Sequence, residues 1–197
     1  YSRAGASSPT QCSPGTWQNQ TGQSSCIEAS PGHYASGYGN TNETACGLGT
    51  WTGQSGQSSC TPASPGHYVD TNGSTVQTPC SLGTWNNVSG QTYCTNASAG
   101  YYVDTNGSTV QTPCDAGTYN PSNGSNSSSD CGDVPAGNYS GPGASAPTSC
   151  SIGTWQDQDG QSSCMDASVG HYVDTNGSTS QTPCGLGTWN NMTGQAV

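Results

Sequence analysis

Cysteines recur along most of this 197-residue chain in an alternation of one shorter and one longer interval. They stand at Cys12, Cys26, Cys46, Cys60, Cys80, Cys94, Cys114, Cys131, Cys150, Cys164 and Cys184. Only the stretch around Cys131 departs from this alternation, because the interval before Cys131 is longer and the interval after it is shorter than elsewhere. One short and one long interval together make a fixed period of about 34 residues, which predicts a repeat array rather than one globular core.

Composition points to disulfides as the main stabilising element. Hydrophobic residues make up 28% of the chain, against about 45–50% in ordinary globular domains. Apolar burial alone is therefore too small to offset the backbone entropy lost on folding. Zinc sites would require closely spaced cysteines, whereas even the nearest ones here, such as Cys12 and Cys26, are widely separated. Disulfides in turn predict an oxidising, extracellular compartment.

The period divides into two half-units of equal length, each with glycine at its fourth position and an aromatic residue at its sixth. Cys12 begins the first half-unit, Ala29 the second and Cys46 the third. The glycines are Gly15, Gly32, Gly49, Gly66, Gly83, Gly100, Gly117, Gly137, Gly153, Gly170 and Gly187. The aromatics are Trp17, Tyr34, Trp51, Tyr68, Trp85, Tyr102, Tyr119, Tyr139, Trp155, Tyr172 and Trp189. Trp and Tyr half-units thus alternate almost throughout, and we expect the aromatic row to pack neighbouring units together.

The internal alignment favours one disulfide connectivity. In four Tyr half-units the two cysteine slots hold Ala and Gln or Glu, as at Ala63 and Gln77, so the slots lose cysteine together. Joint loss of both cysteines is expected of a disulfide-bonded pair, because loss of one cysteine alone would leave the other as a reactive thiol. The predicted bridges are Cys12–Cys26, Cys46–Cys60, Cys80–Cys94, Cys114–Cys131 and Cys150–Cys164. The rival scheme begins with Cys26–Cys46 and gives no reason for paired loss.

Cys184 is left without a partner in this scheme, because the matching position would be 198. A free thiol or an intermolecular bridge is one interpretation, and a chain cut in mid-repeat is the simpler one. The predicted boundaries are a partial repeat at 1–11, repeats at 12–45, 46–79, 80–113, 114–149 and 150–183, and a partial repeat at 184–197.

Eleven N-x-S/T sequons support a secreted glycoprotein. They are Asn19, Asn42, Asn72, Asn87, Asn96, Asn106, Asn123, Asn126, Asn138, Asn176 and Asn191. Several keep a fixed register: Asn19, Asn87 and Asn191 each follow a cysteine at the same distance, and Asn72, Asn106 and Asn176 share another slot.

Three of the Tyr half-units contain the sequence Val-Asp-Thr-Asn-Gly-Ser-Thr, at residues 69–75, 103–109 and 173–179. Asn-Gly between β-prone residues is a strong signal for a two-residue type I′ hairpin. It predicts pairing of Val69 with Val76 around a turn at Asn72 and Gly73. No stretch shows helical periodicity.

The motif Cys-x-x-Gly-Thr-Trp/Tyr…Gly-x-Ser-Ser-Cys, at Cys12–Cys26, Cys46–Cys60 and Cys150–Cys164, resembles the ephrin-receptor-like cysteine-rich repeat, which is related to tumour-necrosis-factor-receptor modules. The family's Cys-x-x-Cys junction is replaced here by Cys26-Ile-Glu-Ala29, so half of its bridges are missing. The resemblance implies an elongated extracellular ladder of small β modules. The expected fold is therefore a small disulfide-rich β protein, a rod of such half-units with short hairpins and little other regular secondary structure.

Few residues suggest chemistry. His33, His67 and His171 each precede the Tyr of a half-unit, where surface packing is the simpler interpretation than metal binding. Asp70-Thr-Asn-Gly-Ser74 opens like an EF-hand loop, but Ser81 stands where a bidentate Glu is needed. We therefore predict no catalytic or metal residues and no cofactor beyond N-glycans, leaving weak calcium binding open.

Two functions fit these patterns. Eleven acidic residues against Arg3 alone give a net charge of −10, which disfavours nucleic acid and anionic membranes, and no apolar run suggests membrane insertion. The first hypothesis is a non-enzymatic structural glycoprotein that self-associates into a surface fibre, filament or coat. The second is a ligand-binding or stalk ectodomain of a receptor or adhesin, with its site at the break in the repeat, residues 120–130.

Overall fold

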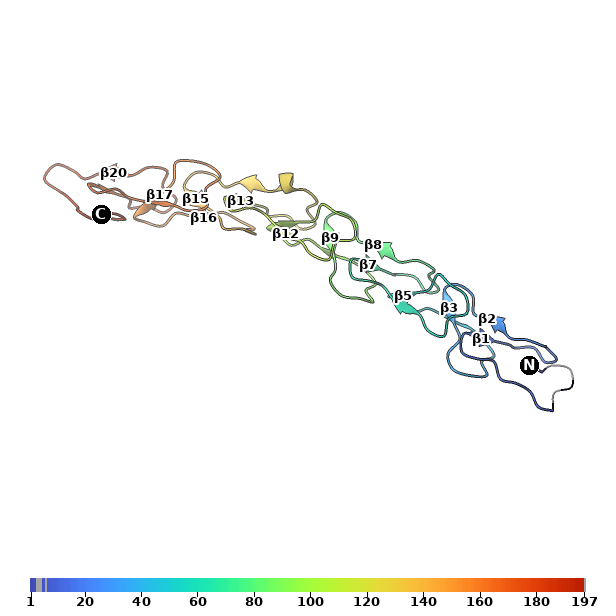
Figure 1. Ribbon diagram of the computed structural model, residues 1–197. Coiled ribbons are helices and arrows are strands. Elements are labelled where there is room, and N and C mark those ends of the chain that lie inside the picture. The colour runs from blue at the N-terminus through green and yellow to red at the C-terminus, as the bar shows by residue number, and fades with distance from the viewer. Residues whose placement is uncertain (3–4, 6, 197) are drawn as a thin grey trace. The chain divides into compact units, whose positions relative to one another are not determined.

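A computed structural model describes residues 1–2, 5 and 7–196, so part of the predicted partial repeat 1–11 lies outside the described residues. Within the described residues the chain forms antiparallel pairs of two-residue strands and one short 3₁₀ helix (Figure 1). The pairs are β1 (Thr16–Trp17) with β2 (Ile27–Glu28), β3 (His33–Tyr34) with β4 (Thr44–Ala45), β5 (Thr50–Trp51) with β6 (Thr61–Pro62), β7 (His67–Tyr68) with β8 (Thr78–Pro79), β9 (Thr84–Trp85) with β10 (Thr95–Asn96), β11 (Tyr101–Tyr102) with β12 (Thr112–Pro113), β13 (Thr118–Tyr119) with β14 (Gly132–Asp133), β15 (Asn138–Tyr139) with β16 (Thr148–Ser149), β17 (Thr154–Trp155) with β18 (Met165–Asp166), and β19 (His171–Tyr172) with β20 (Thr182–Pro183). The helix η1 spans Ser128–Asp130. The predicted class, a disulfide-rich β protein built from repeated half-units, is confirmed.

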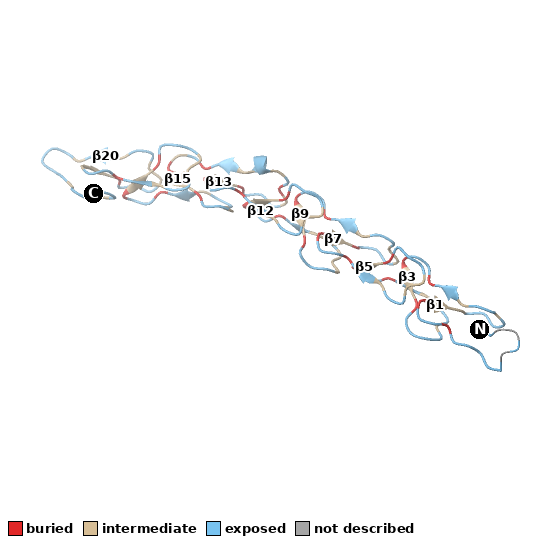
Figure 2. Ribbon diagram, viewed as in Figure 1, coloured by how far each residue is buried: buried red, intermediate tan, exposed pale blue. Residues whose placement is uncertain are grey.

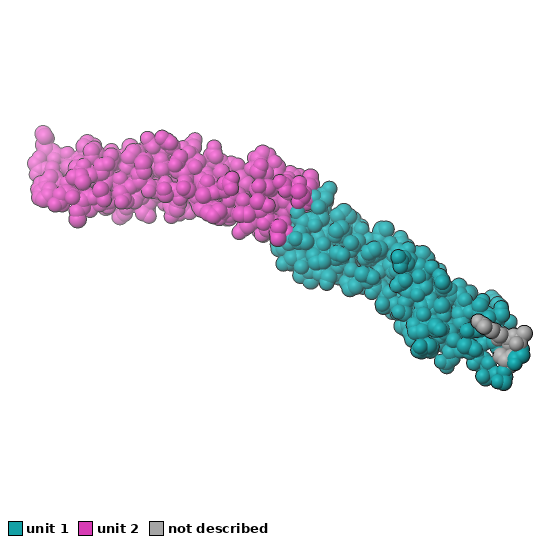
Figure 3. Space-filling model, in the orientation of Figure 1, with its two compact units in different colours: residues 1–81, 85–95, 106–109 teal, residues 82–84, 96–105, 110–197 magenta. Residues whose placement is uncertain are grey.

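The chain divides into two compact units, coloured separately in Figure 3. Unit 1 comprises residues 1–81, 85–95 and 106–109, and unit 2 comprises residues 82–84, 96–105 and 110–197. In each unit, successive half-units are joined by the same backbone hydrogen bonds.

The half-unit that begins at Ala29 shows these bonds to its successor in unit 1. The Gly32 N–H donates to the Thr52 carbonyl at 2.7 Å, and the Ala35 N–H to the Gln57 carbonyl at 3.0 Å. In the opposite direction, the Gly56 N–H donates to the Ala29 carbonyl at 2.8 Å. The backbone N–H and C=O groups that such short strands leave unpaired are therefore hydrogen-bonded to the next half-unit.

The fourth-position glycine is required by both its conformation and its neighbours. Gly32 has φ +81°, where L-residues with a Cβ are strained. A Cβ built on it would also collide with the carbonyl oxygen of Gly73, two half-units further along. Glycine at this position therefore allows backbone to lie directly against backbone.

The core consists of small side chains rather than aromatic rings. Residues at the first position of the half-units, such as Ala29 and Cys46, are completely buried, and Val69 and Val103 at the seventh position are nearly so (Figure 2). The strand residue at the sixth position, for example Tyr34, is only half-buried. The aromatic row therefore flanks a narrow core column that the sequence analysis did not identify.

Disulfides join Cys12 to Cys26, Cys46 to Cys60, Cys80 to Cys94, Cys114 to Cys131 and Cys150 to Cys164. These are the disulfides predicted from the joint loss of cysteine at the two slots, and each has a Cα–Cα distance of 5.7 Å. Cys184 is half-buried and free.

The predicted Asn-Gly hairpin is wrong. The strands of this half-unit pair His67 with Pro79 and Tyr68 with Thr78, across a much longer loop. Type I′ geometry needs a positive φ at both central residues, and among described residues only glycines have one. Val69 instead donates its N–H to the Gln91 carbonyl of the following half-unit at 3.0 Å.

Candidate interaction surface

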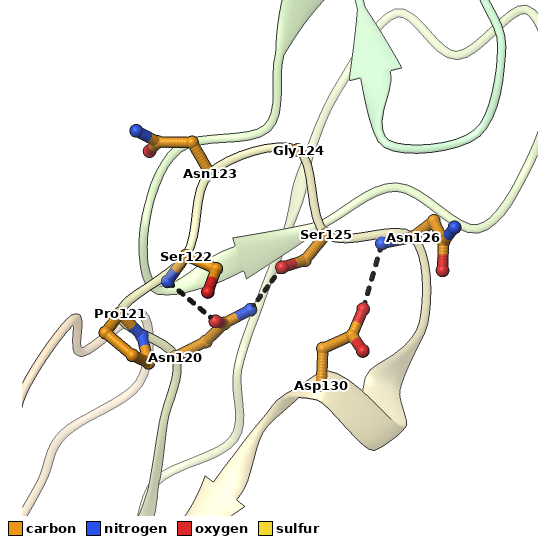
Figure 4. Close-up of a pocket in the computed structure, with 8 residues that line it drawn as sticks. All are labelled: Asn120, Pro121, Ser122, Asn123, Gly124, Ser125, Asn126 and Asp130. Atoms are coloured by element: carbon orange, nitrogen blue, oxygen red, sulfur yellow. Dashed lines mark hydrogen bonds between the residues drawn. The ribbon is translucent and has the colours of Figure 1, made fainter.

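The break in the repeat forms an open polar hollow of about 370 Å³ in unit 2. Asn120, Pro121, Ser122, Asn123, Gly124, Ser125, Asn126 and Asp130 line it (Figure 4). The sequence separation of the bridged cysteines is 17 here instead of 14, and the lengthened loop contains η1. This is the segment that the sequence marked as a possible recognition site.

Buried Asn120 holds the first turn of this loop. Its Nδ2 donates to Ser125 Oγ at 2.7 Å, and its Oδ1 accepts from the Ser122 N–H at 2.9 Å. Figure 4 shows the Asn120 side chain between these two serines. The amide thus replaces the interior packing that an apolar residue such as Val103 gives at the same position elsewhere.

Asp130 holds the second turn. Its Oδ2 accepts from the Asn126 N–H at 3.0 Å and from the Ser127 N–H at 3.2 Å, and Ser127 caps η1. The carboxylate is therefore engaged in loop structure, and the hollow presents amides, hydroxyls and one carboxylate. Such a lining suits hydrogen bonding to a polar ligand, and it offers no nucleophile paired with a base.

The predicted sequon asparagines are exposed in most cases. Asn138 is half-buried in β15, and its Nδ2 donates to the carbonyls of Pro135 and Ala136, both at 3.2 Å. Asn123 and Asn176 are exposed, but each accepts a hydrogen bond at Oδ1 from a backbone N–H of an earlier half-unit.

The three histidines lie apart in equivalent places. Each imidazole Nδ1 is 3.3–3.4 Å from the carbonyl oxygen two residues earlier in its own turn. Asp70 is exposed, and the neighbouring Thr71 and Ser74 hydroxyls bond to each other at 2.8 Å. Over residues 1–2, 5 and 7–196, no three His, Cys, Asp or Glu side chains cluster as a metal site would require.

Sequence reasoning missed the hydrogen bond that closes the loops of four Tyr half-units. Gln77 Oε1 accepts from the Ser64 N–H at 2.7 Å, although the two residues are 13 apart. The equivalent bonds are Ser98 N–H to Gln111, Ser168 N–H to Gln181 and Ser30 N–H to Glu43. We call this contact the amide clasp. Its signal was present, because the second cysteine slot, where cysteine is absent, holds Gln or Glu in these four half-units.

Residues 137–195 match the family described as tyrosine-protein kinase ephrin type A/B receptor-like. The match confirms the predicted ephrin-receptor-like repeat for that segment, while the likeness to tumour-necrosis-factor-receptor modules stays a prediction. No curated protein matches the chain. The match and the disulfides together indicate an extracellular, receptor-type module. The described part of the chain contains no helix of the length and apolarity that crossing a bilayer demands.

Proposed function

We propose that the chain is a structural extracellular glycoprotein that forms a stiff, glycan-coated segment of a surface fibre, filament or coat. The observation that carries this proposal is the hydrogen-bond ladder between half-units. Three backbone hydrogen bonds and a glycine contact recur at successive steps within each unit. A net contribution of about 1 kcal/mol per hydrogen bond makes each step resistant to bending or sliding.

The surface supports the same proposal. Most sequon asparagines are exposed, in both units, and acidic residues are spread thinly over the sequence. Equivalent surfaces that recur along a repeat suit side-by-side or end-to-end self-association. We propose that the chain acts without catalysis and without a cofactor other than its glycans.

Electron microscopy of the secreted, glycosylated chain tests this proposal. We expect ordered filaments or sheets whose axial spacing is a multiple of the half-unit rise. Analytical ultracentrifugation should show concentration-dependent assembly in parallel. Monodisperse monomers over the whole concentration range would contradict the structural role.

A receptor or adhesin ectodomain is the second candidate, and the family match at residues 137–195 favours it. Its ligand site would be the polar hollow at residues 120–130. Shortening the Cys114–Cys131 loop until its cysteine separation falls from 17 to the 14 of the other bridges should abolish binding of a soluble partner. Unchanged binding would place the site elsewhere, and filaments that form normally from the shortened chain would favour the structural role.

A further inference from the structure

One sequon slot lies at the backbone of an earlier half-unit, next to a residue whose aliphatic side chain is exposed. In unit 2, the Ile152 N–H donates to Asn176 Oδ1 at 3.0 Å. Two backbone bonds flank this contact, from Gly153 to the Val173 carbonyl and from Gly177 to the Cys150 carbonyl. Asn176 is thereby fixed beside Ile152, whose side chain is 53% exposed.

The two flanking backbone bonds recur at the equivalent position in unit 1. Leu48 is 54% exposed, and the bonds from Gly49 to the Val69 carbonyl and from Gly73 to the Cys46 carbonyl join the segment that contains Asn72 to the residues near Leu48. Exposed aliphatic side chains in a core-poor protein lose the free energy that burial would give, about 25 cal/mol per Å². In both places the residue in this slot is a sequon asparagine.

We propose that N-glycans on Asn176 and Asn72 fold back over Ile152 and Leu48, so that the first sugar covers the aliphatic side chain. This inference rests on the proposed glycan coat and gives two of its glycans a packing role. The bond to Ile152 uses Oδ1 of Asn176, which leaves Nδ2, the atom that carries an N-linked sugar, free of that contact. Nδ2 and Oδ1 are bonded to the same carbon, Cγ, so an N-acetylglucosamine on Nδ2 begins close to the Oδ1 atom that accepts the hydrogen bond. Its C–H face and acetyl methyl group are apolar surfaces that suit an aliphatic side chain.

Asn123 provides a matched control within unit 2. It occupies the same slot and accepts from the Ala99 N–H at 2.8 Å, but Ala99 offers only a methyl group. Val169 is the opposite control, because it is 57% exposed and the residue in the equivalent slot is Thr193, the hydroxyl residue of the Asn191 sequon, which cannot itself carry an N-linked sugar. Covering should therefore occur at Ile152, be much weaker at Ala99 and be absent at Val169.

Methyl-labelled NMR tests the proposal, since the chain contains only two isoleucines, Ile27 and Ile152. Three glycoforms are compared: intact glycans, a single N-acetylglucosamine left by an endoglycosidase, and none after peptide N-glycosidase, which leaves Asp with its Oδ1 acceptor. We expect nuclear Overhauser effects between the sugar and the Ile152 δ1-methyl in the first two forms. The Ile152 methyl should shift in the third form, while the Ile27 methyl does not.

Mass spectrometry of glycopeptides separates the outcomes. If Asn176 is occupied and the Ile152 methyl is identical in all three glycoforms, the covering is wrong while the glycan coat stands. If Asn176 alone is unoccupied, the covering is likewise overturned, and if no sequon is occupied, both proposals are overturned. The variant Ile152→Ser should leave occupancy unchanged and release the sugar, which would be seen as narrower anomeric proton signals.

Discussion

Asn138 differs from Asn176 because both atoms of its amide are already engaged. Its Nδ2 donates to two carbonyls, and its Oδ1 accepts from Ser149 Oγ at 2.9 Å. A glycan on Nδ2 would disrupt donor bonds worth about 1 kcal/mol each. We predict that glycopeptide mass spectrometry of the secreted, folded chain will find Asn138 almost unoccupied and Asn126 and Asn176 occupied. Comparable occupancy at Asn138 and Asn176 would contradict this prediction.

The fourth position of a half-unit should tolerate no side chain. Substitution of a glycine that has a positive φ but open space around it should cost less. Gly32 and Gly22 have similar φ values, +81° and +75°, but only the Cβ of an alanine at Gly32 meets backbone, because the space around Gly22 is open. Gly22→Ala should cost about 1–2 kcal/mol from the left-handed conformation. Gly32→Ala should cost that amount plus about 1–3 kcal/mol of steric strain. Urea unfolding of the two variants measures the difference, and equal costs would show that the Gly32–Gly73 contact is not tight.

At the scale of the element, five half-units close their loops with a disulfide and four with an amide clasp, whereas the half-unit at residues 134–149 contains no Cys, Gln or Glu for either device. The clasp of the half-unit that begins at Ala63 is the bond from the Ser64 N–H to Gln77 Oε1. Gln77→Ala should therefore destabilise this half-unit by about 1 kcal/mol, the net value of one hydrogen bond. Hydrogen exchange at the Ser64 amide should accelerate, whereas Gln57→Ala, which leaves that clasp intact, should not affect it. Unchanged exchange at Ser64 in Gln77→Ala would show that the clasp is not formed in solution.

Replacing the clasp by a disulfide is the complementary prediction. Ala63 and Gln77 occupy the slots that hold cysteine in the adjacent Trp half-units, so the double variant Ala63→Cys/Gln77→Cys should form a sixth bridge. A loop of roughly 15 residues gives about 3 kcal/mol in the chain-entropy model, and the lost hydrogen bond subtracts about 1 kcal/mol. Thiol titration should still find one free cysteine, Cys184. Three free thiols would show that the two slots are not equivalent to a cysteine pair.

How far the sequence predicts these elements depends on where the stabilising contact comes from. The disulfide pairs and the half-unit length follow from residue types that recur at fixed spacing, and both agree with the structure. The Asn72-Gly73 turn was assigned to a local hairpin, but Val69 is buried and Val76 is 67% exposed, so they do not face each other. The backbone partners of that segment belong to neighbouring half-units, and a local pattern cannot reveal them. The hollow at residues 120–130 was located as a break in the repeat, but its geometry depends on the Asn120 and Asp130 hydrogen bonds.

At the scale of the molecule, stability should depend on register between half-units rather than on any single core. The fourth-position glycines of both half-unit types make the same bond to the next half-unit, as Gly32 and Gly49 show. Repeat arrays of this kind behave as a sum of local and nearest-neighbour terms. A deletion that removes a whole number of half-units should therefore leave the ladder continuous, whichever type it removes.

Deletion of residues 46–79 removes one full period, and deletion of residues 46–62 removes a single Trp half-unit with its own cysteine pair. We expect both variants to be secreted with one free thiol and with native-like amide protection in the half-units on either side of the junction. Deletion of residues 46–70 removes the same two cysteines but shifts the later glycines out of register, so it should misfold. Hydrogen exchange by mass spectrometry compares the three chains, which all lose the same cysteine pair. If the deletion of residues 46–62 misfolds as badly as that of residues 46–70, alternation of the two half-unit types, and not the backbone register, is what the fold requires.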